Sequence, residues 1–474
     1  MSVRLLALAA LALAGAAPRE CGPAADADPG PSVSVASFGA RGDGVSDDTA
    51  ALQSAIDSLG RGVTLRFEPR VYRIAGDRGL RLRDDVRLDL AGATLTAANV
   101  DGARCRILDV SATRNVTIAG GTLVGSRSGV PDWGVGILAS DAEDLTIEDV
   151  TLRDFYFDGI LLTGNRGCRR VRIRSVVAEN NRRTGLAIPA ATDVTVEDST
   201  FRGSRGQSPQ AGANCEPNAG GEVRRVAFRR STFEGNAGVG LYMHRALGVT
   251  VADVTAEDNV VRGNDQGIVA SGAEGARIVR NRVSGHRARG RSGIALGEGT
   301  VRAEVQDNVL EDNLRGIVAA GATAVTISGN TIVGTGPLSG AGAGDDGDGI
   351  VCRGLKGVLE GACTVSGNTV RRVAGSGIVA QLVARVSIEE NVVDEAGQRG
   401  VYLRSALASE VRGNRVSAVG LESPGRYDAI ELQASAHDNL VSDNACRPGA
   451  SAREAVGVGP GCLRNRVFGN VTVP

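Results

Sequence analysis

A glycine followed by an aliphatic residue returns at nearly regular intervals over most of this chain, and no other feature constrains its fold as strongly. The intervals run from 23 residues, between Gly136 and Gly159, to 33 residues, between Gly316 and Gly349. The full set is Gly136, Gly159, Gly185, Gly240, Gly267, Gly293, Gly316, Gly349, Gly377 and Gly400, with Gly212 in register after Gly185. A repeat of this period is typical of a solenoid, in which each repeat packs on its neighbours.

Short alternating segments rich in β-branched residues lie between the glycine steps. Examples are LTIEDVTL, VRIRSVVA, VTISGNTI and VSIEENVV, and their period of two favours strands over helices. One repeat has no room for a helix, so successive repeats must stack as parallel strands. The 66 glycines and the 3 % aromatic content fit many short strands with tight turns. We therefore predict an all-β fold, a single-stranded right-handed parallel β-helix.

Asparagine recurs where one short strand gives way to the next. The residues in this setting are Asn308, Asn330, Asn368, Asn391 and Asn414. Asn tolerates the left-handed backbone conformation that a sharp corner needs, and stacked Asn side chains can form ladders. We expect these residues to adopt that conformation and to form such a ladder.

The segment SDDTAALQSAIDSLG, from Ser46 to Gly60, predicts a short helix that caps the N-terminal end of the coil. Asp47, Asp48 and Thr49 offer N-cap oxygens. One apolar helical face is made by Leu52, Ile56 and Leu59, and Gly60 is a natural stop. The alternative is that Asp43, Asp47 and Asp48 bind a metal ion. We favour helix capping, because helix initiation already uses these residues.

The first residues have the pattern of a secretory signal. Arg4 precedes the apolar run LLALAALALAGAA, and Ala14 and Ala16 make a small-residue cleavage site. We predict a signal peptide at residues 1–17, a linker at 18–32 and a β-helix domain at 33–474 with its cap at 33–60. The expected location is secreted or periplasmic, with no membrane association after cleavage.

The eight cysteines contain no C-x-x-C pair, which removes the usual spacing of a structural zinc site. Disulfides are the better interpretation for an exported chain. The closest pairs in sequence are Cys352 with Cys363 and Cys446 with Cys462, and these are the predicted bonds.

The charges nearly balance, with 53 basic and 54 acidic residues and a formal net charge of -1. This balance argues against a nucleic-acid partner. All basic residues except Lys356 are arginines, and nine of them crowd residues 166–205. Because the arginine fork binds carboxylates in bidentate fashion, this local excess suits an acidic polysaccharide.

The opening segment SFGARGDGVSDDTAALQSAID resembles the corresponding motif of the pectate-lyase-like superfamily, which includes rhamnogalacturonase and epimerase-like β-helix proteins. The resemblance implies a right-handed β-helix that handles polysaccharide on one outer sheet. The Arg-Ile-Lys and His-Gly signatures of polygalacturonases are absent here, as is the Asp-Pro-His-Glu signature of alginate epimerases. DFYFDG, from Asp154 to Gly159, faintly resembles the setting of the latter, so the reaction stays open.

Strand alternation assigns a direction to each residue of a repeat. Aligned on the glycine step, six residues point inward: Ile160, Leu162, Leu186, Ile188, Leu241 and Met243. One outward column contains Leu161, Ala187, Asn214, Tyr242 and Val269, and the next contains Thr163, Pro189, Glu216, His244 and Ser271. The polar and titratable side chains of Asn214, Glu216, Tyr242 and His244 thus form a patch about one sugar ring across. A surface Glu beside a His is also a common pair without function.

Two reaction classes compete for this patch. Glycoside hydrolysis uses two carboxyls about 5 to 9.5 Å apart, whereas strand dimensions place Asp158 about 10 Å by 16 Å from Glu216. Elimination or C5 epimerisation of a uronate instead needs a base, a proton donor and a group that neutralises the carboxylate. His244 and Tyr242 suit the first two roles, and Asn214 or a protonated Glu216 suits the third.

We therefore predict a polyuronate lyase or C5-epimerase that acts on an acidic polysaccharide. A glycoside hydrolase of the same superfamily and a non-catalytic carbohydrate-binding scaffold remain alternatives. The candidate substrate-binding residues are Arg182, Arg183, Arg205, Tyr156 and Asp158. No cofactor is required by this chemistry, although the loop AGAGDDGDGI, with Asp345, Asp346 and Asp348, admits calcium.

Overall fold

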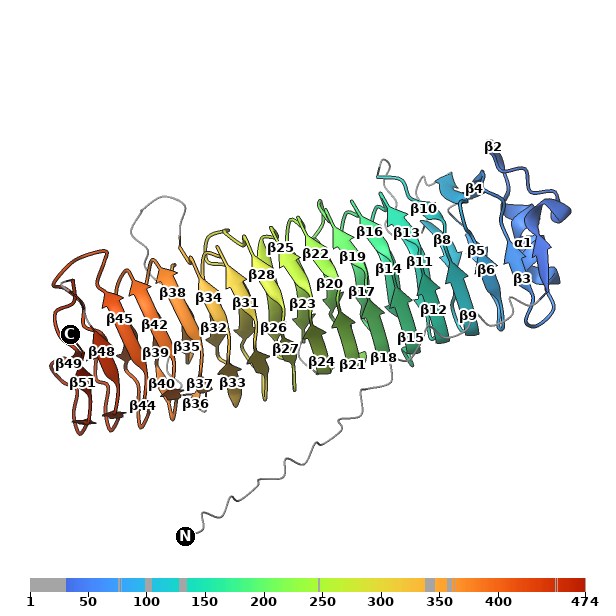
Figure 1. The fold of residues 1–474 in the computed structure, drawn as a ribbon. Coiled ribbons are helices and arrows are strands. Elements are labelled where there is room, and N and C mark those ends of the chain that lie inside the picture. Colours follow the sequence, from blue (N-terminus) through green and yellow to red (C-terminus); the bar gives the residue numbers. More distant parts are fainter. Residues whose placement is uncertain are drawn as a thin grey trace, which may run out of the picture.

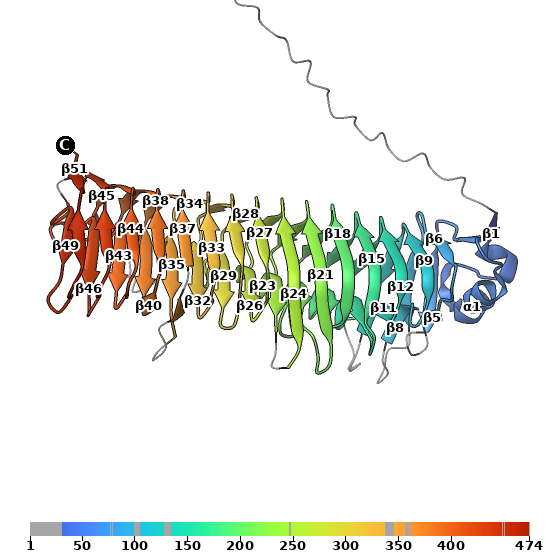
Figure 2. The same ribbon diagram turned by 90° about the horizontal axis from the view of Figure 1, so that it is seen from below.

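The computed structural model is a long coil of short strands with one α-helix at its N-terminal end (Figures 1 and 2). It describes residues 31–75, 77, 79–98, 105–127, 134–245, 248–336, 346–355, 360–361, 363–447, 449 and 451–473. The predicted signal peptide and nearly all of the predicted linker lie outside these ranges. Within them, no helix has both the length and the hydropathy to cross a bilayer.

Three long sheets run the length of the coil, and every strand pair within them is parallel. Among the described residues, sheet C has fifteen strands. In order they are β5 (Leu80–Arg81), β8 (Cys105–Asp109), β11 (Gly134–Ser140), β14 (Asp158–Thr163), β17 (Thr184–Ile188), β20 (Ala211–Cys215), β23 (Val239–His244), β26 (Gln266–Ser271), β29 (Ile294–Gly297), β32 (Ile317–Ala320), β35 (Ile350–Arg353), β39 (Ile378–Gln381), β43 (Val401–Arg404), β46 (Ile430–Gln433) and β49 (Val456–Val458).

Sheet A follows sheet C within each coil. Its strands are β1 (Ser32–Ser34), β3 (Thr64–Arg66), β6 (Arg87–Asp89), β9 (Arg114–Ala119), β12 (Glu143–Glu148), β15 (Cys168–Arg174), β18 (Ala191–Glu197), β21 (Glu222–Arg229), β24 (Thr250–Glu257), β27 (Arg277–Val279), β30 (Glu304–Gln306), β33 (Val325–Ser328), β37 (Cys363–Ser366), β41 (Ser387–Glu389), β44 (Glu410–Arg412), β47 (Leu440–Ser442) and β50 (Arg466–Phe468).

Sheet B completes each coil before the chain returns to sheet C. Its strands are β2 (Asp43–Asp47), β4 (Val71–Ala75), β7 (Thr94–Ala98), β10 (Thr122–Val124), β13 (Thr151–Arg153), β16 (Val177–Glu179), β19 (Thr200–Arg202), β22 (Thr232–Glu234), β25 (Val260–Arg262), β28 (Arg282–Ser284), β31 (Val309–Glu311), β34 (Thr331–Val333), β38 (Thr369–Val373), β42 (Val392–Ala396), β45 (Arg415–Val419), β48 (Ala445–Arg447) and β51 (Val471–Thr472). A separate pair joins β36 (Glu360–Gly361) to β40 (Val383–Ala384).

The glycine step has a steric cause. A Cβ added at Gly159 would lie 2.6 Å from the backbone oxygen of Gly185, and one added at Gly185 would lie 2.7 Å from that of Gly212. Carbon atoms do not approach oxygen so closely, so the coils stack at this spacing because these positions carry no side chain. The repeat in the sequence is therefore the repeat of the coil, and the predicted β-helix is confirmed.

The core is a continuous aliphatic column inside the three sheets. The six residues predicted to point inward are all fully buried: Ile160, Leu162, Leu186, Ile188, Leu241 and Met243. Because side chains alternate along a strand, their intervening neighbours on sheet C face outward, and this outward face carries the candidate site.

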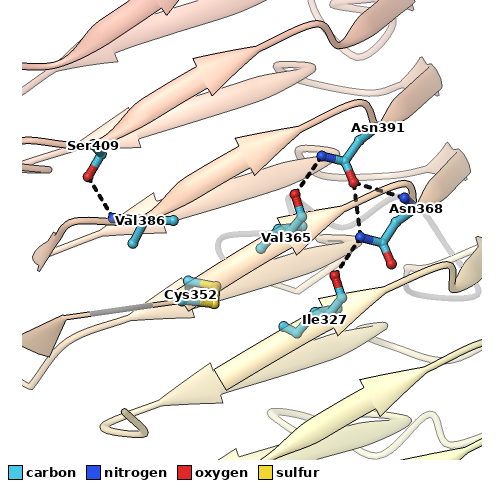
Figure 3. The surroundings of a disulfide bond; sticks show 8 residues. Ile327, Cys352, Val365, Asn368, Val386, Asn391 and Ser409 are labelled. Carbon is cyan, nitrogen blue, oxygen red and sulfur yellow. Dashed lines mark hydrogen bonds between the residues drawn. A yellow bond between two sulfur atoms is a disulfide. The ribbon is translucent and has the colours of Figure 1, made fainter. Parts of the chain in front are cut away.

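The predicted asparagine ladder is present at the corner between sheets A and B. The side-chain amide of Asn368 donates to Asn391 Oδ1 at 2.9 Å (Figure 3). The same contact repeats from Asn308 to Asn330. The backbone prediction was wrong, because the left-handed residue is the one before each Asn, such as Asp307 or Glu390. The Asn side chain instead satisfies buried backbone groups of adjacent coils, which costs least when identical residues stack.

The helix α1 (Thr49–Ser58), preceded by the 3-10 turn η1 (Val35–Phe38), lies over the first coils (Figure 1). Leu52 and Ile56 of α1 are fully buried, and Leu59, just after it, is nearly so. The predicted apolar face therefore closes the N-terminal end of the core.

The ends of this helix differ in detail from the prediction. The Asp47 carboxylate accepts a hydrogen bond from the backbone N–H of Thr49 at 2.9 Å. Asp48 makes no such cap and accepts from the N–H of Arg41 at 2.7 Å, because its side chain turns back to the preceding loop. The helix ends at Ser58 with Leu59, and not Gly60, as its C-cap.

The two predicted disulfides have different outcomes. Cys352 and Cys363 are bonded (Figure 3). Cys446 and Cys462 are free thiols, which corrects the second pairing. Cys446 faces the apolar core of β48 and is fully buried, whereas Cys462 lies in the half-buried turn after β49, so closeness in sequence did not bring their side chains together.

Candidate functional site

The outward face of sheet C has the register that the sequence predicts. Leu161, Ala187, Asn214, Tyr242 and Val269 are paired in that order on strands β14, β17, β20, β23 and β26. Five successive coils therefore align these side chains in one straight column. Leu161, Ala187, Asn214 and Val269 are nevertheless buried, the first two in an outer apolar cluster with Phe157, so only Tyr242 of this column is partly open to solvent. The prediction succeeded because parallel coils without insertions in sheet C keep equivalent residues side by side.

Asn214, Glu216, Tyr242 and His244 meet on two adjacent coils, and we call them the central patch. Asn214 Nδ2 donates to Glu216 Oε2 at 3.0 Å. The rings of Tyr242 and His244 are stacked, with centroids 5.1 Å apart and planes 15° from parallel. Asn214 is buried, while the other three are half-buried. Glu216, Tyr242 and His244 thus share one surface, and Asn214 lies beneath it.

A buried charge network supports one side of the central patch. The Arg183 guanidinium donates to Asp158 Oδ2 through Nη1 at 3.1 Å and to Glu216 Oε2 through Nη2 at 3.5 Å. The Thr184 hydroxyl donates to Asp158 as well. Asp158 is fully buried, so Arg183 separates it from the surface that Glu216 reaches.

This network changes the distance argument made from the sequence. Strand spacing alone placed Asp158 far from Glu216, yet one guanidinium contacts both carboxylates. The register agrees with that placement, since Asp158 pairs with Thr184 and Thr184 pairs with Ala211, five residues before Glu216. The Arg183 side chain spans the gap. Asp158 nevertheless has no access to a sugar, so the two carboxylates do not form the exposed pair that glycoside hydrolysis uses.

Two groups of the site have shifted pKa values. Burial raises the pKa of Asp158 to about 6, against the lowering influence of the Arg183 charge and the hydrogen bonds from Thr184 and Arg183. Burial and then the Glu216 charge raise the pKa of Tyr242. The phenol therefore keeps its proton at neutral pH, which suits a proton donor.

Two polar atoms of the central patch have no hydrogen-bond partner among the described residues. They are Asn214 Oδ1 and His244 Nδ1, and both are buried. A buried polar atom without a partner costs free energy, and such atoms recur where a ligand supplies the missing contact. Because both atoms are covered, the imidazole can act on a substrate only through its other ring nitrogen, Nε2.

The other predicted binding residues lie beside the patch, towards the N-terminal coils. The Arg182 guanidinium lies 4.1 Å from the ring centroid of Tyr156, and that of Arg183 lies 4.8 Å from the ring of Phe157. These cation–π contacts fix both guanidinium groups. Arg205 is exposed on the loop before β20. The structure therefore gathers Tyr156 and Arg182 into one edge of the site, and it makes Asp158 a support for Arg183.

The sequence interpretation missed Thr184 and Phe157 as parts of this support. Both precede a glycine step, at Gly185 and Gly159, and no polarity pattern sets them apart from other coils. The available signal was position, since both residues lie just before a glycine step.

The acidic candidates for a metal site have other partners. Asp43 accepts from the backbone N–H groups of Val45 and Ser46, which lowers its pKa to about 2. Asp346 pairs with Arg315 at 2.7 Å, and Asp348 accepts from the N–H of Ser376. Asp345 lies outside the described residues. Within the described ranges, no three His, Cys, Asp or Glu side chains are arranged to hold a metal ion.

A large open depression lies on a different face, over sheet A. Its lining includes Arg170, Asp144, Arg225 and Asp193. These charges are already paired with one another, because Arg170 contacts Asp144 at 2.7 Å and Arg225 contacts Asp193 at 2.6 Å. Because these four charges are already paired, this depression is a weaker candidate than the central patch, which holds unpartnered atoms.

A family model described as a right-handed β-helix region matches residues 133–304, 219–354 and 348–457 of the chain. Mannuronan C5-epimerase AlgE4 of Azotobacter vinelandii is 31% identical over 185 residues, which is 35% of this chain and 33% of the relative. Mannuronan C5-epimerase AlgE6 of the same organism is 35% identical over 141 residues, 25% of this chain and 16% of the relative. The chain thus spans a third or less of the length of these curated relatives.

The structure is similar to the crystal structure of PfbA, a surface adhesin of Streptococcus pneumoniae. The match covers 82% of this chain and 91% of the PfbA chain. The TM-score is 0.50 at 16% sequence identity. At that identity the likeness concerns the fold alone.

Proposed function

Because the chain belongs to the right-handed β-helix family, we propose that it is an exported enzyme that removes the C5 proton of a uronic acid residue in an acidic polysaccharide. The observation that carries this proposal is the meeting of Asn214, Glu216, Tyr242 and His244 on adjacent coils of one outward face. The predicted signal peptide supports export.

The arrangement of the two rings favours elimination as the outcome. Tyr242 and His244 are stacked at 5.1 Å, which leaves no room for a sugar ring between them. Both groups must therefore approach the same face of the sugar. In elimination the base takes the C5 proton, a double bond forms between C4 and C5, and the C4–O4 bond breaks as O4 receives a proton. A base and an acid on one side satisfy this sequence.

In this proposal His244 is the base and Tyr242 donates the proton to O4. Arg182, which makes no ion pair within the described ranges, neutralises the substrate carboxylate and so stabilises the negative charge that develops beside it at C5. Asn214 is buried and holds Glu216 through their hydrogen bond, and Glu216 in turn holds Arg183. Arg205 and Tyr156 bind neighbouring sugars.

C5 epimerisation is the second candidate, and the two curated relatives named as mannuronan C5-epimerases favour it. It begins with the same proton removal but requires a donor on the opposite face of the sugar. Within the central patch, no residue lies on the far side of a sugar that is bound against Tyr242 and His244. The geometry therefore ranks epimerisation below elimination.

The test is incubation of the purified protein with a panel of polyuronates. Ultraviolet absorbance detects the unsaturated ends made by elimination, and NMR of the polymer detects epimerisation. Loss of either activity in His244→Ala and Glu216→Gln supports the site. Gln381→Ala, on the same outward face but five coils away, is the control that should retain full activity.

Two results would contradict the proposal. Unchanged activity in both central-patch variants would mean that the site lies elsewhere. Retained polymer binding without any product in the wild type would instead favour a binding scaffold.

A further inference from the structure

A second cluster lies on the same two outward columns of sheet C, near its C-terminal end. Tyr402 of β43 is paired with Glu431 of β46, and Arg404 is paired with Gln433. The column that holds Tyr242 continues through Val269, Ala295, Val318, Val351 and Val379 to Tyr402. Six strand spacings separate Tyr242 from Tyr402, about 29 Å.

Arg399 organises this cluster. Its guanidinium lies 4.1 Å from the ring centroid of Tyr402 and 4.6 Å from that of Tyr427. Its Nε donates to Glu431 Oε2 at 2.6 Å, and the Glu431 side chain is 1 % exposed. The Tyr402 hydroxyl lies 3.3 Å from Gln433 Oε1, and the Gln433 amide donates to Glu431. These contacts link Arg399, Glu431, Gln433 and Tyr402 into one network, which holds Tyr402 in place. We call Arg399, Tyr402, Arg404, Tyr427, Glu431 and Gln433 the distal patch.

Arg404 is the free cation of the distal patch. It is exposed, and within the described ranges it makes no ion pair, although its charge acts on Tyr402. Tyr402 is half-buried, so part of its surface remains open. A fixed aromatic surface beside a guanidinium matches a uronate, whose C–H face packs on the ring while its carboxylate accepts from the fork.

The distribution of tyrosine separates this cluster from chance. The chain has five tyrosines. Tyr156 and Tyr242 lie at the central patch, and Tyr402 and Tyr427 lie at the distal patch, which leaves Tyr72 in the N-terminal core. The column between the patches contains small side chains, Val and Ala, so no large side chain of that column blocks a polymer lying along the axis.

The distal patch lacks the groups for proton transfer. It has no histidine, and its one carboxylate in the outward column, Glu431, is buried in contact with Arg399. A base must reach the proton that it takes, and Glu431 does not reach the surface. The distal patch therefore suits binding.

We propose that the distal patch is a second binding site for the polysaccharide, at which a uronate packs on Tyr402 and places its carboxylate on Arg404. The identity of the polymer class rests on the proposed function. A chain that occupies both patches at once is retained more strongly than one that occupies either, because the second contact is intramolecular.

The experiment compares the wild type with Tyr402→Ala/Arg404→Ala on polymer and on oligosaccharides too short to span about 29 Å. We expect the Kd for the polymer, measured by calorimetry, and the KM for the polymer to rise about tenfold or more, with kcat unchanged. Kinetics on the short substrates should not change. Val318→Ala, in the same column and three strands from either patch, is the matched control. Thermal unfolding verifies that each variant is folded.

The outcomes separate this inference from the proposed function. An unchanged polymer Kd in the double variant overturns the distal site, whatever the enzyme does. A weakened Kd in a protein that makes no product supports the distal site while the proposed reaction fails. Absence of any polyuronate binding by the wild type overturns the inference.

Discussion

The central and distal patches occupy the same two outward columns of one sheet, yet they treat their carboxylates in opposite ways. Glu216 has a side chain that is 35% exposed and meets Arg183 at 3.5 Å, whereas Glu431 is 1% exposed and meets Arg399 at 2.6 Å. The shorter contact of Arg183, at 3.1 Å, is with the buried Asp158. The two carboxylates lie in different columns, because Glu431 is paired with Tyr402 whereas Glu216 lies two residues beyond Asn214. The depth of each carboxylate decides whether it can act on a substrate or only support an aromatic surface.

The largest difference between the patches should appear in turnover. His244→Ala should lower kcat on a short polyuronate about 100-fold or more, because positioned acid–base groups contribute 10²–10⁴-fold. Gln433→Ala, the change at the corresponding column of the distal patch, should leave kcat on that substrate unaltered. Steady-state kinetics on a substrate that spans only the central patch measures both. Equal losses in the two variants would erase the functional distinction.

The arginines that hold buried carboxylates should matter for stability at both patches. Arg399→Ala leaves Glu431 buried without its partner, which should cost about 3 to 5 kcal/mol in the free energy of unfolding. Arg183→Ala likewise leaves the Asp158 carboxylate buried without its cationic partner. Because the pKa of Asp158 is about 6, this carboxyl can take up a proton and lose its charge. We therefore expect Arg183→Ala to cost less at pH 5 than at pH 8, as measured by chemical denaturation.

The control for that pair is an exposed arginine. Arg170 contacts Glu143 and Asp144 at the surface of sheet A. Such pairs are screened by water, so Arg170→Ala should leave the free energy of unfolding nearly unchanged. A loss as large as that of Arg399→Ala would show that burial is not the deciding variable.

Asp158 gives the central patch a pH dependence of its own. The folded state holds the Asp158 proton up to a pKa of about 6, whereas the unfolded chain releases it at the ordinary value of 3.8. Between these values the folded state binds more protons, so stability from this group falls as pH rises, by about 3 kcal/mol in all. The charged neighbours are Arg183 and, beyond it, Glu216.

The measurement is the free energy of unfolding of the wild type and Asp158→Asn at several pH values from 3.5 to 7.5, roughly the window set by these pKa values. The difference between the two proteins should change across the window and be constant above it. Curves that run parallel throughout would contradict a raised pKa at Asp158.

The sequence predicted the coil and the central patch for one physical reason. A step at which a Cβ has no room, such as Gly159, must repeat in every coil, and a period of two then fixes which side of each strand faces out. The register of Asn214 beside Tyr242 followed from these two rules alone. Neither rule required knowledge of any side-chain contact.

The same rules explain what the sequence did not reveal. The distal coil carries Ala429 where other coils carry glycine, so the pattern of glycine steps stopped at Gly400, one coil short of Glu431. The bridge from Asp158 to Glu216 depends on the path of the Arg183 side chain, which no spacing encodes. Contacts made by long side chains across coils are set by packing, and packing is visible only in three dimensions.

The smallest expected effect concerns a single hydroxyl of the distal patch. Tyr402→Phe keeps the ring beside Arg399 and removes only the contact with Gln433 Oε1, 3.3 Å away. A neutral hydrogen bond of this kind contributes about 1 kcal/mol, so the polymer Kd should rise by no more than about fivefold. Tyr402→Ala removes the aromatic surface itself and should weaken binding more. Calorimetry on the two variants ranks these contributions: equal losses would mean that the hydroxyl, and not the ring face, contacts the sugar. In that case the distal patch would bind through polar groups, as the central patch does, and the contrast between them would rest on Glu431 alone.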